Sequence, residues 1–398
     1  MSEPARNIPP TPAPRSADVR HRAFAGSSGD TEHFLTLTAP SHLSFKEQVE
    51  CLESLYSESL RAQGLDHDSA VFRRVYLSDS LTQAETIRRS FLGQDSAENP
   101  VAVSIVQQPP LPYAKIAMSA YHIEGRGKLN KQRLGPSHTL IARKDLKHLW
   151  SARLCAHNTD QSLSSSKQTR RAFNDLIAAL AAQGGTLKDN CVRTWIYVKG
   201  VDIFYQGMVD ERRDMFAHNG LTGDTHFIAS TGIEGGGAHR YDLVVMDAYS
   251  ILGMKPEQIS YLNDFSRLCA TKDYNVHFER GARVSFADRR HYYISGTASI
   301  DAAGDVVHIG DVEKQLDRTL ENIEALLNSG GASLDDMMTM TVYLRDPADY
   351  ARIAERLNER CPELPFVVVQ GPVCRPEWLI EIEGIAATPN KEPSLPEF

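Results

Sequence analysis

The stretch Gln315-Leu-Asp-Arg-Thr-Leu-Glu-Asn-Ile-Glu-Ala-Leu-Leu-Asn-Ser-Gly330, with Thr341-Val-Tyr-Leu344 after it, decides the fold of this chain. Its apolar residues recur every three or four positions, which predicts an amphipathic helix with one buried face. The glycine pair that begins at Gly330 marks the end of that helix. The segment centred on Tyr343 predicts a strand, so the stretch predicts a helix that packs on a sheet.

The same pattern occurs twice more in the chain. One copy runs from Gln48 through a helix that ends in Arg61-Ala-Gln-Gly to the strand Arg74-Val-Tyr-Leu, and another runs from Gln168 to Trp195-Ile-Tyr-Val. The spacing from Gln to Tyr is 28, 29 and 28 residues in the three copies. A near-constant offset of this length indicates internal repeats, so we expect three units with one fold.

The third copy is the clearest, and it predicts the element order β-β-α-β-α-β-β. We expect a first hairpin from residues 292–295 and 306–309, and final strands at 366–370 and 378–385. Strands that alternate with helices favour an α+β unit with both helices on one side of its sheet. Three open sheet faces that meet around an axis would then bury one another. The expected domains are a disordered tail at 1–31, unit 1 at 32–123, unit 2 at 137–252, unit 3 at 275–388 and a tail at 389–398.

Bulk composition narrows the possible functions. The net charge of −8 argues against broad binding to nucleic acid or to an acidic membrane surface. No stretch of eighteen apolar residues occurs, so we expect no membrane span. The six Cys show no paired spacing and the fourteen His no HExxH motif. We therefore expect reduced thiols in a cytoplasmic protein, with no metal and no cofactor.

The end of the third unit, Leu379-Ile-Glu-Ile-Glu-Gly-Ile-Ala, is similar to the terminal strand of the YjgF/YER057c/UK114 family, also called Rid. Members of that family are homotrimers of a chorismate-mutase-like fold with clefts between subunits. Three such units in one chain imply an intramolecular pseudo-trimer. We expect it to be monomeric or to associate weakly with its own copies.

Four further stretches resemble the chorismatase branch of the superfamily. They are Arg193-Thr-Trp-Ile-Tyr-Val with Arg212 after it, Ser230-Thr-Gly-Ile-Glu-Gly-Gly-Gly, Ile294-Ser-Gly-Thr-Ala-Ser-Ile, and Cys374-Arg375 with Glu381 seven residues after the Cys. Chorismatases remove pyruvate from chorismate. The Cys and Gly at the motif positions resemble the type that makes 3-hydroxybenzoate, whereas hydrolytic members that release a dihydrodiol carry other residues there.

Strand alternation places Glu381 and Glu383 on the face that points into the central interface. Carboxylates are costly there unless they are paired or functional. A gap-free alignment of the repeats sets Ala117 and Val245 opposite Glu381, so one of the three sites keeps this acid. The chorismatase resemblance implies that Glu381 protonates the methylene of the enolpyruvyl group.

The resemblance implies roles for the other candidate residues. Cys374 would assist the intramolecular rearrangement, and Gly296 would leave room for the ring. Tyr197 recurs in all three repeats, which favours packing, but it is also a candidate ligand contact. Four arginines would hold the carboxylates of the substrate: Arg193, Arg212, Arg280 and Arg375.

The leading prediction is a chorismatase-like lyase or hydrolase that cleaves the enolpyruvyl ether of chorismate, a small carboxylate. The products would be pyruvate and either a hydroxybenzoate, with 3-hydroxybenzoate favoured, or a dihydrodiol. A Rid-type imine or enamine hydrolase is a second possibility. Those enzymes grip a carboxylate with an Arg before the final strand, where our alignment puts Val373. A third is a pseudo-trimer that binds a small carboxylate without turnover.

Overall fold

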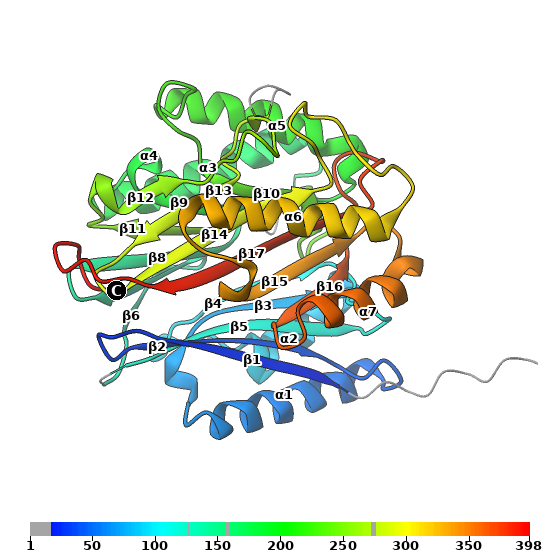
Figure 1. Ribbon diagram of the computed structural model, residues 1–398. Coiled ribbons are helices and arrows are strands. Elements are labelled where there is room, and N and C mark those ends of the chain that lie inside the picture. The colour runs from blue at the N-terminus through cyan, green and yellow to red at the C-terminus, as the bar shows by residue number, and fades with distance from the viewer. Residues whose placement is uncertain (1–16, 126, 156–159, 272–275) are drawn as a thin grey trace, which may run out of the picture.

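The computed structural model describes residues 17–125, 127–155, 160–271 and 276–398. Three sheets meet in the middle of the molecule and the long helices lie outside them (Figure 1). In this view α3 and α5 cover the top, α1 lies at the bottom and α6 lies in front. The prediction of an α+β pseudo-trimer made of three tandem units is confirmed.

Unit 3 has the sheet order β12-β13-β14-β17-β15-β16. Its helices are α6 (Val312–Gly330) and α7 (Tyr350–Arg360). Its strands are β12 (Ile259–Tyr261), β13 (Gly281–Ser285), β14 (Arg289–Ala298), β15 (Met337–Leu344), β16 (Phe366–Gln370) and β17 (Ile380–Pro389). Helix α6 buries its apolar stripe against the sheet and ends at Gly331, whose φ of 84° is the left-handed conformation that glycine adopts without strain.

Units 1 and 2 repeat this topology, with sheet orders β4-β3-β5-β2-β1 and β10-β9-β11-β8-β7-β6. The elements of unit 1 are β1 (Asp18–Ala25), β2 (Thr31–Thr38), α1 (Phe45–Ala62), β3 (Ala70–Leu77), α2 (Ser80–Arg89), β4 (Ala102–Gln107) and β5 (Ile116–Glu124). Those of unit 2 are β6 (Asn130–Gly135), β7 (His138–Arg143), β8 (Leu146–Leu154), α3 (Ser165–Ala182), α4 (Leu187–Asn190), β9 (Cys191–Val198), α5 (Val201–His218), β10 (Ala229–Glu234) and β11 (Val244–Leu252).

The strand register confirms the alignment of the repeats. Glu381 lies opposite Tyr343, just as Ala117 lies opposite Tyr76 and Val245 opposite Tyr197. The three tyrosines that head the repeats are at most 1% exposed. These positions are therefore equivalent in space, and the acid is present in unit 3 alone.

The repeated glutamine has a structural cause. Gln48 accepts a hydrogen bond from the N–H of Lys115, and Gln315 accepts one from the N–H of Leu379, both at 2.8 Å. Gln168 accepts in the same way from the start of β11. Each buried amide thus fixes the first turn of a helix to the start of the last strand of its unit. An unpaired amide at this depth would be destabilising, which explains why the residue recurs.

Short backbone bridges join the three units. Gln107 pairs with Gly236 between units 1 and 2, and Pro110 pairs with Val369 between units 1 and 3. Ala229 at the start of β10 bridges to Glu279, which precedes β13. One edge strand of each sheet, β4, β10 or β16, is thereby tied to a neighbouring unit.

Two expected tails are wrong within the described residues. Residues 1–16 of the N-terminal tail lie outside them, but Asp18–Ala25 form β1, which pairs with β2 along its full length. The sequence did not predict this strand because several of its residues are charged. Charged residues occur there because β1 is an edge strand whose outer side faces solvent. At the other end, Phe398 is 1% exposed and packs on Arg289 and Phe286.

The first hairpin of unit 3 is also corrected. It consists of β13 and β14, whereas Val306 forms only an isolated bridge with Ile300. Strands β6 and β12 lie outside the expected bounds of the three units, so the second and third sheets are wider than predicted. Among the described helices, none is long and apolar enough to cross a membrane.

Candidate active site

A cleft of about 270 Å³ lies between units 2 and 3. Helix α5 and strand β10 of unit 2 form one wall, and strands β14 and β17 of unit 3 form the other. Six of the eight predicted site residues line it: Arg212, Arg280, Gly296, Cys374, Arg375 and Glu381. They come from segments up to 169 residues apart in the sequence, and the packing of two units brings them together.

The two serine-containing motifs of the sequence interlock at the base of the cleft. The backbone N–H of Ser230 donates to Oγ of Ser295 at 2.9 Å, and the N–H of Gly296 donates to Oγ1 of Thr231 at 2.9 Å. Strand β14 has an irregular register between Ile294 and Thr297, which frees these groups from its own sheet. The bulge therefore fixes unit 2 against unit 3.

Glu381 lies on β17 and is 6% exposed. Its carboxylate rests against Gly296, where a Cβ would come within 2.2 Å of Oε1. Burial raises the pKa of Glu381 to about 8, and the nearby charge of Glu383 adds to the effect, while Arg193 and Arg280 oppose it. Near neutral pH the group thus holds a proton that it can donate into the cleft.

Cys374 lies in the connection between β16 and β17. Burial raises the pKa of its thiol to about 12, and the proximity of Glu381 adds to this. The Tyr205 hydroxyl on α5 is hydrogen-bonded to the thiol, and burial likewise raises the pKa of Tyr205. Cys374 is therefore a neutral thiol and not a thiolate nucleophile.

Three arginines give the cleft its positive charge. The guanidinium groups of Arg212 and Arg280 lie 5.8 and 5.7 Å from the ring of Phe278. That of Arg375 lies 4.7 Å from the ring of Trp378. Aromatic faces hold the planar guanidinium groups in place, which suits them to bind carboxylates.

A salt bridge fixes the segment that carries Cys374. Arg345, which follows β15, binds both carboxylate oxygens of Asp202 at the start of α5, at 3.0 and 3.2 Å. The same guanidinium donates to the carbonyl of Val373. This contact spans units 2 and 3 at the edge of the cleft, so it holds Cys374 near α5.

The structure does not place Arg193 and Tyr197 in the cleft, although both were predicted to contact the ligand. Arg193 is 2% exposed and binds Oε2 of Glu383 at 2.6 Å. Tyr197 is 1% exposed and lies beneath the guanidinium of Arg74, 5.6 Å away. Strand β9 turns these side chains toward the axis of the molecule. The recurrence of Tyr in all repeats reflects packing there.

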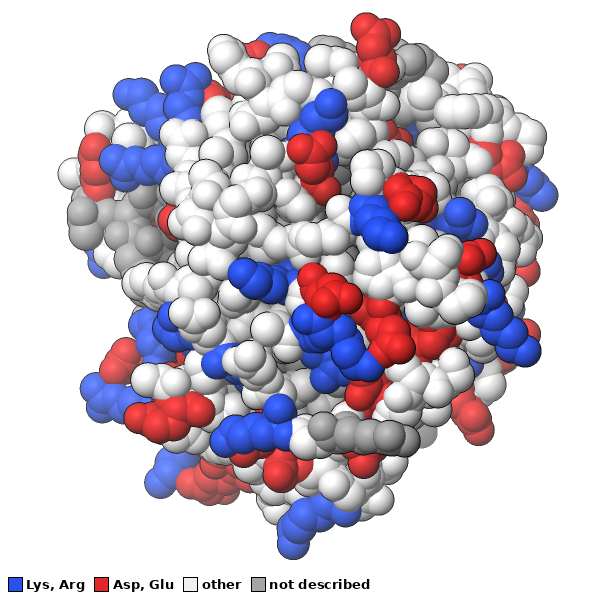
Figure 2. Space-filling model, turned by 90° about the vertical axis from the view of Figure 1, so that its left-hand side faces the viewer, with Lys and Arg blue, Asp and Glu red and all other residues white. Residues whose placement is uncertain are grey.

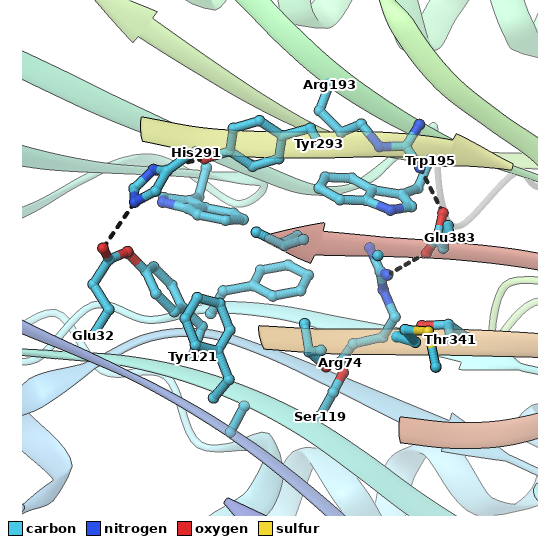
Figure 3. A pocket seen from close by; sticks show the side chains of 18 residues that line it. Glu32, Arg74, Ser119, Tyr121, Arg193, Trp195, His291, Tyr293, Thr341 and Glu383 are labelled. Atoms are coloured by element: carbon cyan, nitrogen blue, oxygen red, sulfur yellow. Dashed lines mark hydrogen bonds and ion pairs between the residues drawn. The ribbon is translucent and has the colours of Figure 1, made fainter. Parts of the chain in front are cut away.

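A cluster of buried charges lies at that axis. It contains Arg74 of unit 1, Arg193 and Asp247 of unit 2 and Glu383 of unit 3, and we call these four residues the axial cluster. Arg74 binds Asp247 at 3.2 Å and approaches Glu383 at 3.6 Å. Figure 3 shows Arg74 and Arg193 reaching Glu383 from different strands, beside a cavity of about 70 Å³.

The sequence did not single out several residues of the cleft. Tyr205 and Thr231 line it from unit 2, and Phe278 and Trp378 line it from unit 3. Thr231 lies inside a quoted motif and Trp378 at the start of an expected strand, but only packing shows which way they point. Within the described ranges, no three His, Cys, Asp or Glu side chains form a cluster that could hold a metal ion.

Comparison with known proteins places the third unit in a large family. The family model Endoribonuclease L-PSP matches residues 283–388. The 3-aminoacrylate deaminase RutC of Acinetobacter baylyi is 38% identical over 96 residues, which are 24% of this chain and 76% of that protein. The region that the family model matches contains Glu381.

Two further proteins match a larger share of the chain. The 3-hydroxybenzoate synthase of Streptomyces hygroscopicus is 26% identical over 258 residues, which are 58% of this chain and 72% of that protein. A crystal structure of a chorismatase superposes with a TM-score of 0.61 at 16% identity, covering 80% of this chain and 93% of that one. The structural likeness extends over the three units together and supports the fold.

Proposed function

Because this chain belongs to the YjgF/YER057c/UK114 (Rid) family, we propose that its acid-bearing cleft cleaves the enolpyruvyl ether of chorismate. The observation that carries the proposal is the carboxyl of Glu381, held protonated between Gly296 and Cys374 in a cleft with three arginines. The similarity to a 3-hydroxybenzoate synthase over most of that protein's length supports the same substrate.

Glu381 is the proposed general acid. Its proton forms the new C–H bond at the methylene carbon of the enolpyruvyl group, and the ether carbon becomes an oxocarbenium-like centre. Attack by water on that centre would release pyruvate and a dihydrodiol. Rearrangement within the ring with loss of pyruvate gives 3-hydroxybenzoate instead. Chorismate contains all the atoms of pyruvate and 3-hydroxybenzoate, so this second outcome needs no co-substrate.

The charge of the cleft matches a substrate with two carboxylates. Arg212 and Arg280 both lie against the ring of Phe278, and Arg375 lies against that of Trp378. Guanidinium groups bind carboxylates with two parallel hydrogen bonds, so two or three of them suffice for a dianion. The volume is near the lower end of the range for small-molecule sites, roughly 300 Å³, which favours a compact ligand.

Cys374 supports 3-hydroxybenzoate as the product. A neutral thiol beside the acid occupies space that a water molecule would otherwise fill, and Tyr205 closes the same side. Excluding water from the cationic centre favours rearrangement over hydrolysis. In this proposal Cys374 directs the outcome without forming a bond to the substrate.

Pyruvate release from chorismate tests the proposal. The assay couples pyruvate to lactate dehydrogenase and separates aromatic products by liquid chromatography. The Glu381→Gln variant keeps the shape of the side chain but carries no acidic proton, so we expect its rate to fall by at least about 100-fold. An undiminished rate in this variant would sink the proposal. Binding of chorismate without turnover by the wild-type protein would instead indicate a binding module.

A second candidate is deamination of an enamine such as aminoacrylate. The 38% identity to a 3-aminoacrylate deaminase over 96 residues favours it. Ammonia release from 2- or 3-aminoacrylate, with no pyruvate release from chorismate, would select this activity.

A further inference from the structure

Glu383 is surrounded by groups from all three units. Its Oε2 accepts from Nη2 of Arg193 at 2.6 Å and from the hydroxyl of Thr231, and its Oε1 accepts from the Tyr343 hydroxyl at 2.9 Å. Arg74 of unit 1 lies 3.6 Å from Oε1. Two guanidinium groups and two hydroxyl donors thus surround the carboxylate of Glu383, which is the arrangement of a buried ion pair.

The same carboxylate is linked to the cleft through Thr231. Its hydroxyl donates to Glu383 and accepts from the N–H of Gly296 at 2.9 Å and from Arg193 at 2.5 Å. Gly296 is in turn the residue against which the Glu381 carboxylate rests. A continuous set of contacts therefore leads from the axial cluster to the acid of the cleft.

Glu381 and Glu383 are alternate residues of β17, so their side chains leave the same face of the strand about 7 Å apart. Glu381 turns into the cleft and Glu383 toward the axis. Both are at most 6% exposed, so water screens their repulsion weakly. A fixed negative charge at Glu383 thus makes ionisation of Glu381 unfavourable.

We propose that Glu383 is a positioning residue that keeps Glu381 in its protonated, acid form, and that unit 1 takes part in this through Arg74. The axial cluster carries two positive and two negative charges, so its net charge is zero. Of its two carboxylates, that of Glu383 lies nearer to the cleft. Unit 1 has Ala117 in place of an acid. It contributes instead the cation that stabilises Glu383.

Other charged and titratable groups also face Glu381. Arg193 and Arg280 favour the ionised form of Glu381 and so lower its pKa. Burial, followed by the charge of Glu383, raises that pKa, and the net result is a pKa of about 8. The other charged and titratable groups of the cleft and of the neighbouring strand belong to three segments: Tyr205 and Arg212 of α5, Cys374 and Arg375 before β17, and Tyr343 of β15. The hydroxyls of Tyr205 and Tyr343 and the thiol of Cys374 do not ionise near neutral pH, because burial raises the pKa of each.

Direct titration of Glu381 tests the proposal without any substrate. The protein is labelled with ¹³C at the Glu side-chain carboxyl carbon, and the Glu381 signal is identified by its absence from Glu381→Gln. In the wild-type protein we expect a titration midpoint near pH 8. In Glu383→Gln we expect the midpoint to fall toward the 4.5 of an ordinary Glu, because the repelling charge is gone. The amide oxygen can still accept from Thr231, and the amide N–H can donate to the oxygen of the Tyr343 hydroxyl.

The matched control is Glu32→Gln, which removes another buried, arginine-paired carboxylate at the other end of the central cavity (Figure 3). It should leave the midpoint of Glu381 unchanged. If Glu383→Gln does not fold, the double variant Arg74→Met, Glu383→Gln replaces it. These two substitutions remove one positive and one negative charge, so the remaining charges of the axial cluster, Arg193 and Asp247, still cancel. A midpoint that stays near pH 8 in the folded variant would overturn the proposal, as would an equal fall in Glu32→Gln.

The inference rests on the proposed function only for its effect on turnover. If chorismate is the substrate, the alkaline limb of kcat/KM against pH should move down with the midpoint of Glu381 in Glu383→Gln. A purely structural role would lower the rate without moving that limb. If chorismate is not turned over at all, the carboxyl titration still decides the role of Glu383.

Discussion

Gly296 lies directly against the carboxylate of Glu381, and a Cβ at residue 296 would stand 2.2 Å from Oε1. The resemblance to chorismatases implied that this glycine leaves room for the substrate ring. In the structure the space that it leaves is occupied first by the acid. The identity of residue 296 therefore determines where the proton donor lies.

The first prediction concerns Gly296→Ala. The new methyl group displaces the carboxylate of Glu381, which is the end of a flexible side chain, so the fold should persist. A displacement of about 1 Å at the acid lowers kcat by about 100-fold, with a smaller effect on KM. The control is Gly223→Ala, where a Cβ meets no atom within 4 Å. Equal kcat values for the two variants would contradict the prediction.

The second prediction concerns the pH dependence of stability. Folding raises the pKa of Glu381 from 4.5 to about 8, so the folded protein binds this proton more tightly than the unfolded chain. The stability from this group is fully present below pH 4.5 and is lost as the pH rises through about 8. Glu381→Gln has no such loss. Relative to the wild type it should gain on the order of 4 kcal/mol in free energy of unfolding between pH 5 and 9.

Urea denaturation of both proteins at several pH values measures this gain. Substitution of Glu124, whose side chain is half exposed, gives the matching control and should show no comparable trend. A constant difference between Glu381→Gln and the wild type from pH 5 to 9 would contradict the raised pKa of Glu381.

The third prediction concerns the product. Removing the sulfur of Cys374 opens a space beside Glu381 that a water molecule can enter, since polar groups of the cleft surround it. Cys374→Ala should therefore shift the product from 3-hydroxybenzoate toward the dihydrodiol, measured by liquid chromatography. Cys51→Ala on α1 is the control, with an unchanged product ratio. An unchanged ratio in Cys374→Ala would show that the thiol does not direct the outcome.

The fourth prediction concerns the buried ion pairs of Glu32 at the interface between units 1 and 3. Glu32 on β2 accepts from Arg289 at 2.7 Å and pairs with His291 at 2.8 Å, both on β14. Burial opposes the charge of Glu32, but His291, Arg289 and Tyr121 outweigh it and lower the pKa of Glu32 to about 2. Glu32→Gln leaves Arg289 short of a buried partner and should destabilise the protein by about 3 kcal/mol at pH 7.

The deficit of Glu32→Gln should shrink as the pH falls from 4.5 toward 2, because the stabilisation by an acid of lowered pKa disappears over that range. Glu124→Gln, with its partner His33 in a half-exposed pair, should cost less than about 1 kcal/mol. Equal losses of stability in the two variants would mean that the buried ion pairs of Glu32 contribute no more to stability than the half-exposed pair of Glu124.

The sequence predicted the fold best at positions that recur in all three repeats, because each such residue has the same structural role in every unit. The helices that begin near Gln48, Gln168 and Gln315, and the buried strands centred on the tyrosines, lie where the pattern predicts them. The single acid followed from the alignment of Ala117 and Val245 with Glu381, which the strand register reproduces. Periodicity within each unit sufficed for these conclusions.

Features that depend on contact between units were beyond sequence patterns. Arg193 lies within a matching motif, yet Glu383 of another unit holds it at the axis rather than in the cleft. Strand β1 was taken for a tail because its charged residues face solvent at a sheet edge. Tyr205 showed no signal, since only the packing of α5 against unit 3 brings its hydroxyl to Cys374.

The covalent link between the units has a consequence for how the protein behaves at low abundance. A site assembled from separate subunits is lost when dilution lets them part, whereas here both walls of the cleft belong to one polypeptide. The effective concentration of one wall for the other is set by the connecting segment and does not depend on how many molecules are present. Specific activity should accordingly stay constant down to the lowest enzyme concentration that can be assayed.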